Sequence, residues 1–395
     1  MTPRRALFWV HLTAGSVAGL VVLVMSVTGV LLAYKRQIIR WADRSFQSQP
    51  APAGRRMPLE ELLARMQAAE GRMPSAITVR PEATAPVAFD FGRERTMFVD
   101  GYTGQVLGEE SPQLRRFFST VEDLHRWLGS GAASRTSGRA VTGACNLAFL
   151  FLVTTGPFLW WPKEWNQVNL RKIALLRGGT WNRARDWNWH NTLGSWCAVP
   201  LLFIVITGVI MSYAWANNLL YRMTGNTPPP PANAAASQGR SDREPRQGKG
   251  HGPENVGFEG LGNWFARAEQ QVPGWTTISV RLPASQPHKL TFSIDRGNGG
   301  RPDLRSQLAL DTASGVVTSQ EDFASYNSGR RLRMWARFTH TGEAFGLVGQ
   351  TVAALAAAGA SFLALTGLSL AIRRFAGWKK RRSLRQGQGT PNVAA

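Results

Sequence analysis

The chain of 395 residues has few of the groups from which most catalytic sites are built. It has two cysteines, Cys145 and Cys197, and both fall within apolar stretches, so no disulfide framework is predicted. No cluster of histidine, cysteine and carboxylate has zinc spacing, and no glycine-rich phosphate loop follows a predicted strand. No serine or cysteine lies in a hydrolase context. The sequence therefore offers no zinc site, no flavin or nicotinamide domain and no hydrolase nucleophile.

Acidic residues are also scarce, at 25 against 46 lysines and arginines, which gives a net charge of +21. So basic a chain usually suggests a nucleic-acid partner, but long apolar runs point to a lipid bilayer instead. Four segments reach the length of about 20 apolar residues that spans a membrane. They are Leu7–Tyr34, Val141–Trp161, Trp189–Ala216 and Phe345–Ile372. These spans indicate a membrane protein, so we expect no nucleic-acid partner. The first run is too long for a signal peptide, so we expect it to be an uncleaved anchor.

Basic residues are concentrated in two places between and after these spans. The short loop Lys163–Asp186 is basic, and the tail after Arg373 is more basic still. The positive-inside rule places both in the cytoplasm together with Arg4 and Arg5. An even number of spans then puts both termini in the cytoplasm and the two long intervening segments on the outer side.

Each outer segment has the pattern of a small α+β domain. The first predicts a helix at Pro58–Glu70 and the second a helix near Gly260–Gln271. A turn from Asp100 to Gly104 in the first segment has a counterpart from Asp311 to Gly315 in the second. The expected strands are Ile77–Arg80, Val87–Phe91, Met97–Val99 and Gln105–Leu107, then Thr277–Leu282, Lys289–Ile294, Gln307–Leu310 and Val316–Val317.

The predicted organisation is therefore an α-helical membrane protein built from two parallel repeats. Each repeat consists of a span, an outer α+β domain and a second span. The predicted transmembrane helices cover 1–35, 139–162, 188–216 and 344–374. The outer domains cover 36–138 and 257–343, a disordered outer linker covers 217–256, and the cytoplasmic parts are a basic loop at 163–187 and a basic tail at 375–395.

The strongest internal repeat contains a histidine. Spans one and three both read His-x-Thr-x-Gly-Ser, beginning at His11 and at His190, and both reach a Thr-Gly pair at the same distance. Those pairs are Thr28-Gly29 and Thr207-Gly208. An ionisable residue within a span is costly to bury and usually marks a functional site. Two histidines in register at one depth suggest a ligand bound between the helices.

Four of the six histidines lie in or beside spans, and depth sorts them into two pairs. His11 and His190 are near the cytoplasmic ends, whereas His125 and His340 are on the outer side. Haem suits two neutral imidazoles facing each other across apolar helices. His251 and His288 are expected to be solvated. A glycine follows three of these histidines by four residues and would let the haem macrocycle lie close to the helix backbone (Gly15, Gly129, Gly194). Arginines on the outer side would pair with haem propionates or with an anionic substrate (Arg115, Arg116, Arg126, Arg330, Arg331, Arg333, Arg337).

The chain resembles the PepSY-associated transmembrane family of bacterial inner-membrane proteins over nearly its whole length. The resemblance rests on the histidine-containing spans, on Leu124-His125-Arg126, on Leu159–Pro162 and on Ala216–Arg222. The aspartate-to-glycine turns are similar to those of PepSY domains. The resemblance implies a haem protein, in some members an iron-regulated reductase of ferric siderophores. A fused flavin reductase domain of some relatives is lacking, so a partner or reduced flavin would supply electrons.

These observations together predict a multi-pass protein of the bacterial inner membrane with two haem b groups. His11 and His190 would ligate one iron, and His125 and His340 the other. Electrons from the cytoplasm would reduce a ferric siderophore, Fe(III) to Fe(II), in the periplasm. Alternatives remain open: a single haem, another periplasmic acceptor, or a non-enzymatic PepSY module that binds peptides. A transporter is disfavoured because no span has a central charge or a broken midpoint.

Overall fold

The computed structural model describes residues 2–50, 54–92, 95–162, 164–230, 258–283 and 289–387. The chain forms two compact units, each made of separate segments. The first, here the helical unit, comprises Met1–Lys35, Phe118–Ala216 and Thr339–Ala395. The second, here the sheet unit, comprises Arg36–Phe117 and Asn217–Phe338. His251 and His288, expected to be solvated, lie outside the described residues, as does most of the predicted linker.

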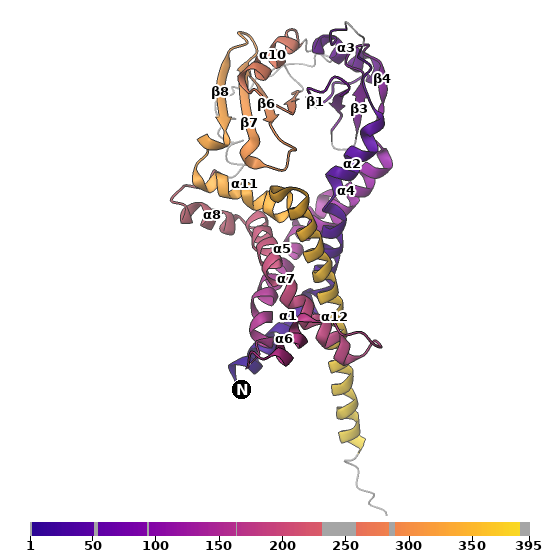
Figure 1. Ribbon diagram of the computed structural model, residues 1–395, viewed down its shortest axis with the longest axis vertical. Helices are drawn as coiled ribbons and strands as arrows, with labels where there is room; N and C mark the ends of the chain where they lie inside the picture. Colours follow the sequence, from indigo (N-terminus) through magenta and orange to yellow (C-terminus); the bar gives the residue numbers. More distant parts are fainter. Residues whose placement is uncertain are drawn as a thin grey trace, which may run out of the picture. The chain divides into compact units, whose positions relative to one another are not determined.

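Four long helices build the helical unit (Figure 1). Within it, α1 and α7 each pack against both α5 and α12. In each apolar window only 17% to 28% of the residues are buried, so most of these residues are at least partly exposed, as contact with lipid requires. The chain is a multi-pass membrane protein. The helices are α1 (Pro3–Leu32), α5 (Arg135–Trp160), α7 (Arg183–Ser212) and α12 (Gly346–Gly387).

Each predicted span corresponds to one of these helices, but the bounds differ. Helix α1 ends at Leu32 and α7 at Ser212, short of the predicted Tyr34 and Ala216, whereas α7 starts earlier and α12 ends later than predicted. Helix α7 starts at Arg183 because the side chain of Asn182 accepts a hydrogen bond from the backbone N–H of Arg185, at 2.9 Å. Helix α12 continues through the basic tail to Gly387. Shorter helices flank the spans in the described part of the chain: α2 (Lys35–Ala42), α4 (Pro112–Trp127), α6 (Gln167–Ala174), α8 (Ala214–Met223) and α11 (Ser328–His340).

The sheet unit contains one antiparallel sheet of eight strands, in the order β4-β3-β2-β1-β5-β6-β7-β8. Strands β1 to β4 come from the first outer segment and β5 to β8 from the second. The two halves join where β1 pairs with β5, with Thr78 opposite Ser279. The strands are β1 (Ala76–Val79), β2 (Val87–Asp90), β3 (Thr96–Val99), β4 (Val106–Glu109), β5 (Thr277–Arg281), β6 (Lys289–Asp295), β7 (Arg305–Asp311) and β8 (Val317–Asp322).

The prediction of two separate outer domains therefore needs correction, because one core runs under both halves of the sheet. Helices α3 (Leu59–Glu70) and α10 (Leu261–Gln271) contribute to this core together with side chains of both halves, such as Phe89 and Phe292, each fully buried. Alternating apolar residues predict a strand, but they do not specify which strand lies beside it. Burial of both halves in one core is what makes the sheet continuous.

The two predicted turns form as expected. In the first, one carboxylate oxygen of Asp100 accepts hydrogen bonds from the backbone N–H groups of Tyr102 and Thr103, at 2.7 and 3.1 Å. Asp311 does the same in the second turn. Each turn ends at a glycine with positive φ, 71° at Gly104 and 63° at Gly315, which explains the glycine at each position.

The start of the predicted linker is wrong, because residues 217–223 lie in helix α8. Tyr221 on this helix is buried and lies so close to Gly329 of α11 that a Cβ there would be 2.5 Å from the ring. The polar, proline-rich composition that indicates a linker begins only after this helix. The predicted domain 36–138 also ends too late, because α5 already begins at Arg135 and the second half of α4 belongs to the helical unit.

Candidate functional site

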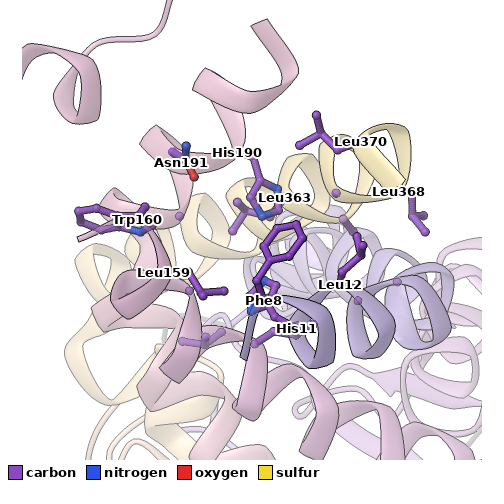
Figure 2. Close-up of a pocket in the computed structure, with 18 of the residues that line it drawn as sticks. Phe8, His11, Leu12, Leu159, Trp160, His190, Asn191, Leu363, Leu368 and Leu370 are labelled. Carbon is purple, nitrogen blue, oxygen red and sulfur yellow. The ribbon is translucent and has the colours of Figure 1, made fainter. Parts of the chain in front are cut away.

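The helical unit brings together the four histidines that the sequence singles out, in the two predicted pairs. His125 on α4 and His340, the last residue of α11, have ring centres 6.4 Å apart with planes inclined by 64°. His11 on α1 and His190 on α7 line one pocket (Figure 2). Both rings point into that pocket.

Each histidine is held by a threonine from a neighbouring helix through the same ring nitrogen, Nδ1. His11 contacts Thr155 on α5 at 2.9 Å, and His190 contacts Thr366 on α12 at 3.0 Å. The other pair repeats the pattern: the Nδ1 atoms lie 2.9 Å from Thr28 Oγ1 for His125 and 3.2 Å from Thr207 Oγ1 for His340. One arrangement thus occurs four times.

The threonine hydroxyls determine which ring nitrogen carries the proton. Each hydroxyl already donates to a carbonyl four residues earlier in its own helix, as Thr155 does to Phe151 at 2.7 Å. The same bond occurs at Thr28, Thr207 and Thr366. The hydroxyl oxygen is then an acceptor, so Nδ1 must be the donor. His340 Nδ1 also lies 2.8 Å from the carbonyl oxygen of Ile204, which can only accept.

This tautomer leaves the other nitrogen, Nε2, with an unshared electron pair. Within the described part of the chain, the Nε2 atoms of these four histidines form no hydrogen bond. A histidine that donates through Nδ1 and presents Nε2 is oriented as a metal ligand, because the outer hydrogen bond fixes the ring. The arrangement can therefore hold a metal ion between the two rings of each pair.

A glycine follows each of these threonines and faces the histidine ring. A Cβ at Gly367 would lie 3.2 Å from His190 Cε1, and one at Gly208 would lie 3.3 Å from His340 Cε1. The corresponding separations are larger at Gly29, 3.6 Å from His125, and at Gly156, 3.8 Å from His11. The glycines thus admit the imidazole edge against the helix backbone, most tightly in the second half of the chain.

The glycines predicted to lie one turn after the histidines divide into two groups. Gly15 and Gly194 do lie on helices and line the pocket between His11 and His190. The inference for Gly129 is wrong, because α4 ends at Trp127. Gly129 has a φ of 71°, and its N–H donates to the carbonyl of Asp123 at 3.1 Å, which makes it a turn residue that ends the helix.

The pocket between His11 and His190 has a volume of about 280 Å³ and is mainly apolar. Side chains from all four long helices line it, including Phe8, Trp160, Asn191 and Leu363 (Figure 2). Three exposed arginines also line it: Arg4 on α1, Arg183 on α7 and Arg374 on α12. An apolar, roughly planar ligand with acidic substituents would find complementary groups there.

The predicted outer arginines are largely engaged within the protein. Arg115 forms an ion pair with the buried carboxylate of Glu110, and Arg330 pairs with Glu321 at 3.0 Å. The side chain of Arg333 donates to Asn217 at 3.1 Å. Arg331 donates to the carbonyl of Ala324. Arg126 lies over Trp127, and Arg337 lies over Phe338.

Burial keeps the two histidines outside the spans neutral. Burial, and then the proximity of His340, lower the pKa of His125 to about 4. Burial likewise lowers the pKa of His340, while its bond to Ile204 acts in the opposite direction. A neutral imidazole is the form that ligates a metal, so both rings are ready for that role at neutral pH.

The two pairs are separated along the bundle by a distance that both halves repeat. Thr28, the partner of His125, follows His11 by 17 positions on α1, and Thr207 follows His190 by the same 17 on α7. At a rise of 1.5 Å per residue this corresponds to roughly 25 Å along each helix. The two sites therefore lie near opposite ends of the spans.

A match to a known protein family extends over all of the histidines and threonines described above. A family model described as PepSY-associated TM region matches residues 8–374. The chain belongs to this family. The match of this PepSY-associated TM protein begins before His11 and ends after Thr366, so the four histidines and their threonines all lie within it. No curated protein matches the chain.

Sequence reasoning missed half of the threonine partners and all three pocket arginines. Thr155-Gly156 and Thr366-Gly367 have the same dipeptide as the pairs noted after His11 and His190, but they lie in spans that contain no histidine. A search for every Thr-Gly pair within an apolar span would have found them. In contrast, no sequence pattern distinguishes Arg4, Arg183 and Arg374, because many other basic residues also flank these spans.

Proposed function

We propose that this protein is a di-haem electron-transfer protein of the bacterial inner membrane that reduces a ferric siderophore in the periplasm. One observation carries the proposal: four histidines, brought together in two pairs, are each held through Nδ1 by a threonine, which leaves Nε2 available as a ligand atom. His11 and His190 would ligate one haem, and His125 and His340 the other.

The separation of the outer pair fits a shared metal ion. Two imidazoles that bind one ion at about 2.0 Å on each side place their ring centres roughly 6 Å apart. The ring centres of His125 and His340 are 6.4 Å apart. For His11 and His190 the supporting observation is the mainly apolar pocket that they line together with three arginines.

Haem bound at these sites would supply a one-electron Fe(III)/Fe(II) couple, whose potential depends on its axial ligands and surroundings. The protein would supply neutral imidazoles with a fixed tautomer and mainly apolar surroundings. The spacing of roughly 25 Å along α1 and α7 is close to the hydrocarbon thickness of about 30 Å, so the two sites would serve opposite faces of the membrane.

The pocket arginines support a second part of the proposal. Arg4 donates to the carbonyl oxygen of Leu159 at 2.6 Å, and Arg374 lies over the ring of Phe8 at 5.1 Å. These contacts hold the guanidinium groups at the pocket, where together with Arg183 they would pair with haem propionates.

Charge gives the proposed orientation. The loop after α5 and the tail on α12 are basic, so the positive-inside rule places the His11 and His190 end in the cytoplasm. A flavin reductase or reduced flavin would donate electrons there. The ferric siderophore would be reduced on the other side, where the gain of one electron lowers the charge of the iron from 3+ to 2+ and weakens its bonds to hard oxygen ligands.

Absorption spectra test the haem content directly. We would purify the full chain in detergent and record oxidised and dithionite-reduced spectra with a haem-to-protein ratio. The expected ratio is two for the natural chain and one for each of His190→Ala and His340→Ala. The reduced protein, mixed with a ferric siderophore, should reoxidise as Fe(II) appears in a chelator assay.

Three other results would each favour a different reading. A ratio of one, lost only with His190→Ala, would leave a single haem and no transmembrane path. Two haems that a ferric siderophore does not reoxidise would point to another acceptor. A colourless protein from haem-replete cells would remove the redox proposal and favour a module that binds peptides.

A further inference from the structure

Helix α8 carries a stripe of large apolar side chains on its outer face. Trp215, Leu219 and Met223 are 55%, 50% and 79% exposed. They follow one another at intervals of four residues, so they lie on one side of the helix. Single exposed apolar residues are common, but three in register on a helix of ten residues form a continuous surface. We call these three residues the α8 stripe.

The opposite side of α8 packs against α11, which lies beside it (Figure 1). The buried ring of Tyr221 lies against Gly329, and the side chain of Asn217 accepts a hydrogen bond from Arg333 at 3.1 Å. At about 100° per residue, the direction midway between Asn217 and Tyr221 lies roughly 180° from Leu219. A polar amide thus faces the protein while large apolar groups face outward, which is the reverse of a helix at a surface in water.

The position of α8 in the chain favours lipid as the occupant of this face. The span α7 ends at Ser212 and α8 begins at Ala214, so Tyr213 alone separates the two helices. Tyr213 is extended, with a φ of −119° and a ψ of 130°, which ends α7 and starts a new helix. Two steps of about 3.8 Å between Cα atoms join the helices. Helix α8 must therefore begin close to the membrane surface at which α7 ends.

The side chains of this face are those that the boundary between lipid and water selects. Tryptophan is enriched there because its indole has a large apolar body and one polar N–H group. Arg222 is exposed at the edge of the α8 stripe. Its apolar stem can lie along the stripe while its guanidinium group reaches lipid phosphates. The face therefore has an apolar part for acyl chains and a cationic edge for headgroups.

A second protein is the main alternative occupant, and the size of the face argues against it. A stable protein interface buries about 800 Å² on each partner, contributed by roughly 20–30 residues. Helix α8 has ten residues, and one side of it is already packed against α11. A bilayer, in contrast, surrounds the end of every span and requires no matching surface.

We propose that α8 is an interfacial helix, which lies at the membrane surface with the α8 stripe inserted among lipid acyl chains. Helices of this kind bury their apolar face roughly 5–10 Å into the boundary between headgroups and acyl chains. Arg222 would bind lipid phosphate at the edge of that face. The proposal does not depend on haem or on an electron acceptor, because it rests on the exposure of α8 and on its place in the chain.

A spin label tests the position of α8 in lipid. We would label Leu219→Cys and Val316→Cys in full chains that also carry Cys145→Ala and Cys197→Ala, reconstituted one per nanodisc in phosphatidylcholine with phosphatidylglycerol. Val316 is the matched control, because it is 53% exposed but does not adjoin a span. Oxygen concentrates in lipid, whereas a nickel chelate stays in water. The ratio of oxygen to nickel collisions should be severalfold higher at position 219 than at position 316.

Two results would overturn the proposal. Equal ratios at the two positions would place α8 in water. A label at position 219 that neither oxygen nor the nickel chelate reaches would mean that a second copy or another protein covers the stripe. An unchanged unfolding temperature would show that the labelled variants remain folded.

Hydrogen exchange gives a second test in a chain that keeps both natural cysteines. Leu219→Gln combined with Met223→Gln should release α8 from lipid and accelerate its amide exchange in nanodiscs roughly tenfold. These three residue types have similar helix propensities, so the helix itself is not weakened directly. Val316→Gln is the control and should leave exchange in α8 unchanged. Exchange in α8 that the double substitution leaves unchanged would contradict insertion of the stripe.

Discussion

Each of the four histidines depends on one threonine of a neighbouring helix. The threonine hydroxyl donates to its own helix, so its oxygen accepts from Nδ1 and leaves Nε2 as the proposed ligand atom. Removing such an outer partner typically weakens metal binding 10- to 100-fold. The threonines are therefore positioning residues, and their effect should be visible in cofactor retention.

Thr155→Val tests this at the site of His11. Loss of the acceptor 2.9 Å from Nδ1 should release the ring and weaken haem retention 10- to 100-fold, so that gel filtration leaves one haem per chain. Thr154→Val is the matched control. Thr154 also donates to its own helix, to Leu150 at 3.0 Å, but it is exposed and contacts no histidine. Equal loss in both variants would show a general defect of α5.

The glycines beside the threonines allow a graded test. A Cβ at Gly367 would lie 3.2 Å from His190, whereas a Cβ at Gly156 would lie 3.8 Å from His11, an ordinary contact. Gly367→Ala should therefore displace its histidine and shift the reduced absorption band and midpoint potential. Gly156→Ala should change neither. A redox titration of both variants measures the difference, and equal shifts would contradict it.

The sequence identifies the histidines but only part of what surrounds them. His11 and His190 repeat in register with a Thr-Gly pair on the same helix, and a repeat is visible without a structure. Thr155 and Thr366 hold these histidines from other helices. No spacing along a single helix reveals a contact between two helices, so these partners emerge only from packing.

Among the elements, the pairing of β1 with β5 joins the two halves of the sheet. Ile278 on β5 is fully buried in the core that both halves share. Ile278→Ala should lower the free energy of unfolding of the sheet unit by about 2–5 kcal/mol. Because the core is continuous, hydrogen exchange should accelerate in β2 as well as in β6. Val316→Ala, at a side chain that is 53% exposed, is the control and should change exchange little.

Asp43 gives the sheet unit a defined pH dependence. Burial, and then the charge of Glu110, raise the pKa of Asp43 to about 6 from 3.8. The folded state then binds more protons than the unfolded state between these values, so this group's contribution to stability falls as pH rises through 6. Asp43→Asn should raise the free energy of unfolding of the sheet unit by about 1 kcal/mol at pH 8, a value reduced because Asp43 is partly exposed. Near pH 4 the substitution should leave the free energy of unfolding unchanged.

Unfolding temperatures at both pH values measure this effect. Glu259→Gln removes an exposed carboxylate of the same unit and serves as the control. If Asp43→Asn raises the unfolding temperature as much at pH 4 as at pH 8, the effect comes from packing and not from ionisation.

The elements themselves are largely predictable, and their partners are not. The helix expected over 58–70 is α3, and the strands expected from alternation correspond to β1 through β8. Helix α12 is longer than the predicted span because the prediction follows the apolar run, whereas the basic residues after it are also good helix formers. The single sheet requires knowing that β1 and β5 are neighbours, which no local pattern contains.

At the scale of the whole molecule, charge predicts which side each part occupies. Alkaline phosphatase fused after Gly225 should be active, because that position belongs to the sheet unit, proposed to be periplasmic. The same fusion after Gly387, at the end of α12, should be inactive. Green fluorescent protein at the two sites is the control and should show the opposite pattern. The reverse result would invert the proposed direction of electron flow.

The register at β1 and β5 has one more consequence. Ile77, Thr78 and Val79 correspond in the two halves to Ile278, Ser279 and Val280, and Thr78 lies opposite its own counterpart. Two identical half-length chains would pair in this way about a two-fold axis. The histidine pairs likewise join counterparts, His11 to His190 and His125 to His340.

This register and these pairs are what a homodimer joined into one polypeptide would have. In a true homodimer every substitution occurs twice, so both ligands of a shared metal would always have the same surroundings. Joining removes that constraint. The backbone is already closer to the ring at Gly367 than at Gly156, so the surroundings of His190 and His11, the two proposed ligands of one metal, can be adjusted separately.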